Sequence, residues 1–438
     1  MITFPFISKL HLQKHQNITE NCEIVSIAPK EGEALTFLMS QHAGEPAVPI
    51  VNVGDKVLLG EKIAKSEGEL SANIHSSVSG TVKSIAQVLD PKKGTTQAIV
   101  IESDGQMEEY SPTEGIADYA TLTRDKFIDI IKEAGIVELD GSGFPAYVKL
   151  NPPTNTKVEY ILVSGVESES YCTSNCRCML EKPQNIKDSL KLILRFFPDA
   201  RVIFAIEAGK NNLIELYSNI FKDTPQITVV AQKPRYPHTS EKIFIKTCVN
   251  REVPQGKAPI DIGVILINAS TLAAIDLAVR NGKPLTTRTV TLSGCAIEKP
   301  GNYEVCVGMS YQSIIDALGG FKLPPKKVIS GDALTGHCFF NLNTPITKND
   351  SVILALSTDE TQICNEQPCI RCSRCAECCQ IGLQPFELNA KFLVADLEGF
   401  KESGGQDCIE CAACSYICPS KRHLAQSIRS AKKAISNG

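Results

Sequence analysis

The sequence has no run of about 18 apolar residues, no excess of positive charge and no signal peptide at its start. A helix that spans a membrane needs such a run, so we expect no transmembrane helix. The formal net charge is −4, whereas nucleic-acid binding requires a strongly basic face, so no nucleic-acid partner is expected. The start, MITFPFISKLHLQKHQN, lacks the apolar core and cleavage site of a signal peptide. These absences, with 43% hydrophobic and 21% charged residues, predict a globular protein of the cytoplasm.

Cysteine, in contrast, is abundant. The chain has 18 cysteines, and half of them lie between Cys369 and Cys418. A disulfide framework would need an oxidising compartment, which the start of the chain does not indicate. Clustered cysteines in a reducing compartment indicate metal ligands instead.

Two four-cysteine runs with the spacing C-x2-C-x2-C-x3-C account for most of this cluster, and Pro419 follows the second. In bacterial two-cluster ferredoxins, which have this spacing, the fourth cysteine of each run ligates the other cluster. We therefore predict two [4Fe–4S] clusters with interleaved ligands. The first set is Cys369, Cys372, Cys375 and Cys418, and the second is Cys379, Cys408, Cys411 and Cys414. Zinc is the alternative, but it usually takes two CxxC pairs or mixed Cys/His ligands around one ion.

The segment PFELNAKFLVADLEGFKESG between the two runs has the apolar spacing of a helix, which we expect to end at Gly404-Gly405. Cys378 is left over by the spacing, and we interpret it as a packed neighbour of the ligands.

Upstream, the hydrophobic pattern changes twice. Between about residues 37 and 103, short apolar runs broken by Gly and Asp predict a small β-barrel or sandwich. From about residue 124, helical and strand-like segments alternate, which indicates βαβ units and a mostly parallel sheet. After residue 286 the pattern is strand, turn, strand and helix, a small α+β unit.

In this order, the pieces resemble the C subunit of the Rnf electron-transport complex and its soluble relatives, which share parts with the flavin subunit of respiratory complex I. SQHAGEPAVPIVNVGDKVLLGEKIA resembles the family's amino-terminal barrel, GSGFPAYVKL the end of its flavin loop, and GVESESYCTSNCRCMLEKP its acidic nucleotide-site segment. TLSGCAIEKPGNYEV is similar to its soluble-ligand-binding β-grasp module, and the two cysteine runs complete the match. The resemblance covers nearly the whole chain.

The resemblance implies a multidomain α/β protein of five parts. These are a barrel-sandwich hybrid β domain (1–110), a central α/β domain related to the FMN/NADH-binding fold (111–285), a β-grasp module (286–325), a return β segment (326–362) and a helical two-cluster ferredoxin-like domain (363–438).

The segment that resembles the family's flavin loop, residues 135–145, departs from the family pattern, and we call it the flavin loop below. Gly141 and Gly143 remain, but Glu138 and Asp140 stand where the family has glycines that let backbone N–H groups approach the FMN phosphate. A like-charge pair about 4 Å apart costs roughly 4 kcal/mol at an effective dielectric of about 20. We therefore expect a degenerate FMN and NADH site.

The resemblance places Glu167 and Glu169 on the nicotinamide side of that site. Beside them, Cys172, Cys176 and Cys178 occupy positions that the family fills with ordinary residues. They could form a redox-active thiol site or a small metal site, with Arg177 favouring thiolate, or they could be inert packed thiols.

Three functions remain open. The first is an electron-transfer component of an oxidoreductase system that passes electrons through two clusters to a partner reductase, directly or through the three thiols, as in the relative associated with proline reductase. The second is an NADH-oxidising, FMN-containing subunit of the Rnf type. The third is a non-redox scaffold. We rank them in this order, with a partner reductase or another electron-transfer protein as partner and with membrane association only through partner subunits.

Overall fold

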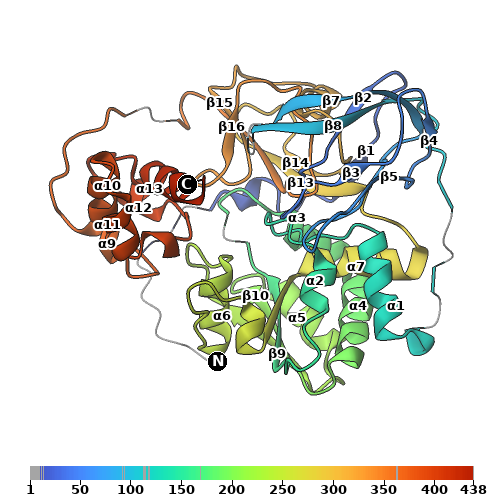
Figure 1. Cartoon of the computed structure of the whole chain (residues 1–438), viewed down its shortest axis with the longest axis horizontal. Helices are drawn as coiled ribbons and strands as arrows, with labels where there is room; N and C mark the ends of the chain where they lie inside the picture. The colour runs from blue at the N-terminus through green and yellow to red at the C-terminus, as the bar shows by residue number, and fades with distance from the viewer. Residues whose placement is uncertain are drawn as a thin grey trace.

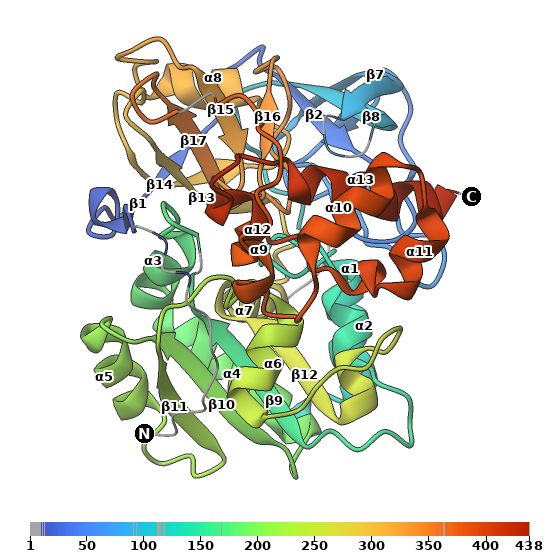
Figure 2. The same cartoon turned by 90° about the vertical axis from the view of Figure 1, so that its left-hand side faces the viewer.

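The computed structural model comprises an upper β-rich part, a lower α/β part and a C-terminal helical domain that lies beside both (Figures 1 and 2). The residues described are 10, 12, 14–90, 92, 94–111, 115–116, 119–167, 169–361 and 364–437. Most of the stretch examined for a signal peptide, and residue 363 at the expected start of the last domain, lie outside them. Among the described residues, no helix is long and apolar enough to cross a membrane.

The central domain is a four-stranded parallel sheet with helices on both faces. Alternate strand side chains point to opposite faces: Ile161 and Val163 pack in one core with Leu272, whereas Leu162 packs in another with Phe244. The strand order is β11 (Ile227–Gln232), β10 (Arg201–Glu207), β9 (Tyr160–Gly165) and β12 (Val264–Asn268). The helices are α1 (Arg124–Glu133), α2 (Ala146–Leu150), α3 (Ser174–Glu181), α4 (Pro183–Phe196), α5 (Asn211–Ile220), α6 (Glu241–Val249) and α7 (Ala269–Asn281).

The order of these strands creates a switch point. From β9 the chain moves outward through β10 to β11, and it then returns to place β12 on the other side of β9. In open α/β sheets, ligands bind at the carboxyl ends of the strands where the order reverses. The fold therefore directs attention to the ends of β9 and β12.

The amino-terminal barrel consists of two small antiparallel sheets. One contains β2 (Ala34–Leu38), β8 (Gly94–Ser103), β7 (Gly80–Asp90) and β4 (Lys56–Val57), and the other contains β3 (Val48–Pro49), β5 (Lys62–Lys65) and β6 (Ile74–His75). Leu35 and Phe37 of β2 lie in one core with Val290 and Leu292, which belong to the next sheet. The barrel is thus packed against the rest of the β-rich part by apolar burial.

A six-stranded mixed sheet joins segments that the sequence pattern separates. Its order is β1 (Ile24–Ile27), β14 (Gly301–Cys306), β13 (Thr287–Ser293), β17 (Val352–Leu356), β15 (Lys327–Ser330) and β16 (His337–Phe339), with α8 (Tyr311–Ala317) beside it. The expected β-grasp module and the expected return segment therefore share one sheet. Strand β1, from the amino-terminal segment, pairs in parallel with β14 at its edge.

The C-terminal domain is helical, as expected, but its middle segment is not one helix. Residue Ala395 has φ +58° and separates two helices, because a left-handed residue breaks the hydrogen-bond ladder. The helices are α9 (Arg374–Glu377), α10 (Pro385–Leu393), α11 (Leu397–Glu402), α12 (Ala413–Ile417) and α13 (Leu424–Asn437). Four 3-10 turns complete the described elements: η1 (Gln16–Ile18), η2 (Tyr119–Thr121), η3 (Pro259–Ile262) and η4 (Gly405–Asp407).

One buried lysine connects three parts of the chain. The Lys348 side chain is 1% exposed. Its Nζ donates to the carbonyl oxygens of Asn73 in the barrel and of Gly135 at the start of the flavin loop, both at 2.7 Å. Burial lowers the pKa of Lys348 from its ordinary value of 10.5 to about 7. A neutral amine still has two N–H donors, which is the number that these carbonyls require.

We predict that Lys348→Met destabilises the full chain by about 2 kcal/mol or more, because two buried carbonyls lose their donor. Lys327→Met, which removes an exposed lysine from β15, should change little. The folded pKa lies below the unfolded one, so the unfolded chain binds more protons between about pH 7 and 10.5. Wild-type stability should therefore rise across this window relative to the variant. Urea unfolding at several pH values measures both effects, and equal midpoints for the two variants would refute the role of Lys348.

Candidate redox site

A polar pocket lies at the switch point between β9 and β12. Its walls come from the ends of these strands, from the flavin loop and from the segment that leads into α3. Residues that line it include Asp140, Glu167, Glu169, Cys172, Asn268 and Arg288. Four of these six are among the residues singled out in the sequence, and the fold therefore brings the flavin loop, the acidic pair and one thiol together.

The acidic pair is held in an environment that favours its protonated form. The Glu167 carboxylate is 6% exposed and accepts hydrogen bonds from the Asn175 amide at 2.8 Å and the Cys172 thiol at 3.3 Å. Burial raises the pKa of Glu167 to about 8, and burial together with Asp332 raises that of Glu169 to about 7. A pocket with two such carboxyl groups can exchange protons near neutral pH.

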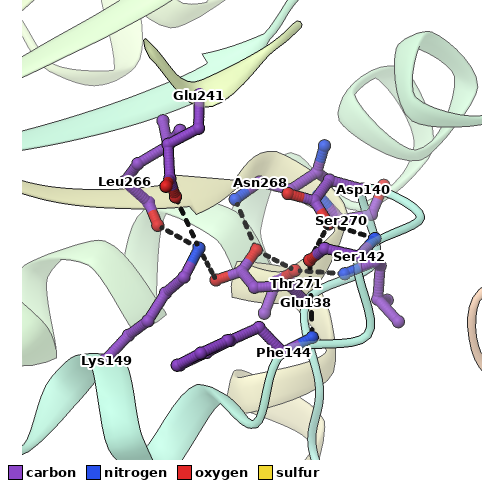
Figure 3. Close-up of polar contacts among 11 residues, drawn as sticks. Glu138, Asp140, Ser142, Phe144, Lys149, Glu241, Leu266, Asn268, Ser270 and Thr271 are labelled. Carbon is purple, nitrogen blue, oxygen red and sulfur yellow. Dashed lines mark hydrogen bonds and ion pairs between the residues drawn. The ribbon is translucent and has the colours of Figure 1, made fainter. Parts of the chain in front are cut away.

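Glu138 does not face the pocket, contrary to the expectation that it stands beside a bound phosphate. Its side chain is fully buried and points to the N-terminus of α7, where Oε2 accepts from the Asn268 amide and the Thr271 hydroxyl, both at 3.1 Å (Figure 3). Its Oε1 lies 3.7 Å from Lys149 Nζ. Burial raises the pKa of Glu138 to about 7.

Lys149 completes this arrangement. Its Nζ also donates to the carbonyl oxygen of Leu266 at 3.0 Å and lies 3.8 Å from the Glu241 carboxylate (Figure 3). Burial works against the charge of Lys149, but Glu138, Asp140 and Glu241 outweigh it and raise its pKa. Lys149 therefore keeps its positive charge at the end of the central sheet.

Asp140 and the loop glycines have local roles. The Asp140 carboxylate accepts from the Ser142 amide at 2.9 Å and hydroxyl at 2.6 Å, which closes the turn (Figure 3). Gly143 has φ +63°, and a Cβ there would lie 2.2 Å from Oδ1 of Asn349. This glycine is thus required for contact with the loop before β17.

The three thiols of the acidic segment do not converge. Cys172 lines the pocket and contacts Glu167, whereas Cys176 and Cys178 lie two residues apart in α3, on nearly opposite sides of the helix. Burial raises the pKa of all three thiols, that of Cys176 to about 12. Arg177, expected to favour thiolate, instead pairs with Glu181 at 2.6 Å.

The eight cysteines of the two runs surround two hollows in the C-terminal domain. Cys369, Cys372, Cys375 and Cys418 line one hollow, and Cys379, Cys408, Cys411 and Cys414 line the other. Each hollow is lined by one of the two sets that the spacing groups together, and Cys378 lines neither hollow; the role of the eight cysteines as cluster ligands stays a prediction. Among the described residues, no three His, Cys, Asp or Glu side chains lie close enough together to hold one metal ion.

The two loops have the same backbone conformation. Arg371 and Ser373 in the first run, and Glu410 and Ala412 at the same places in the second, have φ between +54° and +61°. The Arg371 amide points at Cys369 Sγ and the Glu410 amide at Cys408 Sγ, each at 3.4 Å. Left-handed residues other than glycine cost about 1–3 kcal/mol each, so this conformation indicates a function for both loops.

One hollow faces outward and the other faces the central domain. Cys369 and Cys372 of the first hollow are exposed. Beside the second, the Tyr236 hydroxyl donates to the Cys411 carbonyl oxygen at 2.6 Å. Tyr236 belongs to the loop after β11 that also supplies Thr239 to the pocket wall. The second hollow and the pocket are therefore connected through this loop.

Sequence reasoning missed Lys149, Asn268, Thr271, Arg288 and Tyr236. Asn268 had a signal, because it ends a buried strand and begins a helix as an N-cap. Tyr236 and Arg288 gave no signal in the sequence, since each acts through a contact with a distant segment. Tyr236 donates to the carbonyl oxygen of Cys411, and Arg288 donates to those of Asp350 and Leu139.

The pocket fits FMN only in part. It has the location and the helix N-terminus that an anionic cofactor needs, and Lys149 lies behind its wall, on the carbonyl oxygen of Leu266. The donors that would receive a phosphate, however, are taken by the Glu138 carboxylate. A phosphate and this side chain do not fit the same donors together.

Two protein-family models match separate stretches of the chain. Residues 4–106 match the family model of the RnfC barrel sandwich hybrid domain, and residues 131–277 match that of the Nuo51 FMN-binding domain. The expected fold class is confirmed. The solved NAD+-reducing [NiFe]-hydrogenase in its H2-reduced state aligns with 74% of this chain and 63% of its own at 14% identity and a TM-score of 0.49, too low to bear on function.

Three relatives, each the C subunit of an oxidoreductase complex, match over most of the chain. The one from the proton-translocating ferredoxin:NAD(+) oxidoreductase complex of Clostridium ljungdahlii is 38% identical over 88% of this chain and 83% of its own length. The one from the ion-translocating oxidoreductase complex of Rhodobacter capsulatus is 35% identical over 99% and 84%. The one from the Na(+)-translocating ferredoxin:NAD(+) oxidoreductase complex of Acetobacterium woodii is 36% identical over 93% and 92%.

These relatives favour the second function considered from the sequence, an Rnf-type subunit, over the relay associated with proline reductase, which they do not specifically support. The resemblance inferred from the motifs is confirmed: this chain belongs to the RnfC family, the C subunits of Rnf complexes, and is an electron-transfer oxidoreductase subunit with a domain of the FMN-binding type.

Proposed function

We propose that this chain is the electron-transfer subunit of an Rnf-type, ion-translocating complex and relays single electrons through two [4Fe–4S] clusters. The observation that carries the proposal is the pair of hollows, each lined by one interleaved set of four cysteines. When bound, the clusters would accept and release single electrons, with potentials tuned by nearby charge and hydrogen bonds.

The residues of the chain supply the surroundings of each cluster. Amides of Arg371 and Glu410 point at ligand sulfurs in the two loops, and the Leu383 amide points at Cys379 Sγ at 3.4 Å. Such bonds stabilise the more negative, reduced state. The left-handed loops keep these amides in place, and cluster ligation would offset their backbone strain.

The outward hollow suits contact with a partner. Ile370 in its lining is 67% exposed, Arg371 next to it is exposed as well, and Arg422 also lines the hollow. A small apolar centre with a basic rim favours an acidic electron-transfer protein or another subunit of the complex. We propose that association with a membrane occurs through such partner subunits and that this chain itself works in the cytoplasm.

The inward hollow suits exchange with the pocket of the central domain, through the loop that carries Tyr236. NADH oxidation through FMN is the finer part of the Rnf-type interpretation, and it depends on whether the pocket accepts FMN. Glu138 occupies the donors that the phosphate of FMN would need, so the structure gives no support to FMN binding. The proposal therefore rests on the clusters alone.

A thiol relay is the second candidate, because Cys172 lines the same pocket beside Glu167. Burial and the spread of the three thiols weigh against a dithiol that acts as one unit. Of the three thiols, Cys172 is the one that lines the pocket.

We predict that single ligand replacements remove one cluster each. The anaerobic wild-type chain should hold about eight irons, and Cys418→Ala or Cys379→Ala should leave about four, from opposite clusters. Cys378→Ala is the matched control and should retain all the iron, because Cys378 donates to the Cys375 carbonyl and lines neither hollow. Iron and sulfide analysis with EPR measures this. Loss of iron in Cys378→Ala, with none in Cys379→Ala, would overturn the assignment.

We expect Lys432→Gln to lower the midpoint potential of the inward cluster by tens of millivolts. Lys432 Nζ donates to the Cys408 carbonyl oxygen at 2.7 Å, and its positive charge stabilises the reduced cluster. Lys433→Gln makes the same charge change at an exposed neighbour and should have a smaller effect. A spectroelectrochemical titration compares the two, and equal shifts would argue against the placement of this cluster.

Alkylation at pH 8 distinguishes the thiol relay. Iodoacetamide should label the exposed Cys338 and Cys364 much faster than the buried Cys172, Cys176 and Cys178 of the cluster-loaded chain, because burial raises the pKa of the latter three. Peptide mass spectrometry gives the rates. Rapid labelling of Cys172 would bring the thiol relay back as the leading function.

A further inference from the structure

The N-terminus of α7 forms a cradle for one anion. The Asn268 amide, the Thr271 hydroxyl and the Lys149 ammonium group all approach the Glu138 carboxylate, which no solvent reaches (Figure 3). Helix α7 is 13 residues long, so its N-terminus carries a substantial positive end. A buried ammonium, a hydroxyl and a helix end are the groups that bind phosphate in other folds.

The carboxylate fits this cradle incompletely. Oε2 takes two hydrogen bonds, but Oε1 is buried without one and lies 3.7 Å from Lys149 Nζ. A carboxylate has two oxygens in one plane, whereas a phosphate offers three acceptor oxygens. The cradle thus provides more for an anion than Glu138 uses.

The cradle adjoins the pocket. Leu139 next to Glu138, Leu266 next to the Lys149 ammonium, and Asn268 at the helix end all line the pocket wall. An anionic group that entered the pocket would find its donors at this wall. In the domain family that residues 131–277 match, the named ligand is FMN, whose one phosphate is such a group.

We propose that Glu138 is a built-in substitute for the phosphate of FMN, and that its carboxylate keeps FMN out of the central domain of this chain. The loop residue fills the seat, neutralises Lys149 and preserves the fold that a cofactor would otherwise complete. This inference concerns the pocket only and does not depend on the proposed relay through the clusters.

The geometry supports this arrangement, because the fully buried Glu138 side chain occupies the Asn268 and Thr271 donors and an external phosphate could not reach them while it remains. Other charged groups that face the cradle are Asp140 from the loop and Glu241 from α6, both acidic. They add to the repulsion of a second anion.

The test is equilibrium dialysis of FMN against the anaerobic, cluster-loaded full chain. Wild type should show no saturable binding at micromolar FMN, and Glu138→Gly should bind one FMN at least about a hundredfold more tightly. Riboflavin, which lacks the phosphate, should gain little from the same change. Asp140→Gly is the matched control: its carboxylate bonds to Ser142, so its removal should not admit FMN.

A second measurement tests the proposal even if Glu138→Gly folds poorly. Inorganic phosphate should raise the thermal midpoint of Glu138→Gly but not that of wild type, and Lys149→Met added to Glu138→Gly should abolish both this effect and FMN binding. Stoichiometric FMN on the wild type would overturn the proposal, and so would a Glu138→Gly protein that responds to neither FMN nor phosphate. Iron content, measured in the same samples, tests the relay separately.

Discussion

The arrangement of this protein depends on basic side chains whose N–H groups are buried among backbone carbonyls. Lys348 connects the barrel to the start of the flavin loop by hydrogen bonds. Arg288 on β13 connects the loop at Leu139 to the turn before β17 in the same way. Each side chain comes from the β-rich part and reaches into a neighbouring segment. Because buried polar groups are costly when unpaired, these contacts fix the loop relative to the sheets with little tolerance for movement.

That constraint determines what the pocket can hold. The flavin loop is fixed on both sides, so a side chain at position 138 has one place to go, which is the N-terminus of α7. There it meets Lys149, whose charge it neutralises together with Glu241. A domain of the FMN-binding type is in this way stable with the Glu138 carboxylate in the place of a phosphate.

The C-terminal domain follows a different logic. Its core is small, and its loops contain left-handed residues at repeated places, which a chain adopts only when something else compensates for the strain. Ligation of the two proposed clusters by two sets of four thiolates would be such a compensation. The contact of Tyr236 with Cys411 then connects this domain to the loop that borders the pocket of the central domain.

The sequence alone determined the parts that depend on local spacing. The cysteine runs predicted two interleaved sets of four, and periodicity predicted the barrel, the parallel sheet and the helical end, because these signals lie within a few residues of one another. It also pointed to Glu138 as foreign to the flavin loop. Only the tertiary structure decided that Glu138 fills the cradle rather than borders it, that Asp140 closes a turn, and that Cys172, Cys176 and Cys178 point apart. The physical reason is that each of these outcomes depends on which distant backbone the side chain meets, such as α7, β13 or the loop after β11, and spacing along the chain carries no information about that contact.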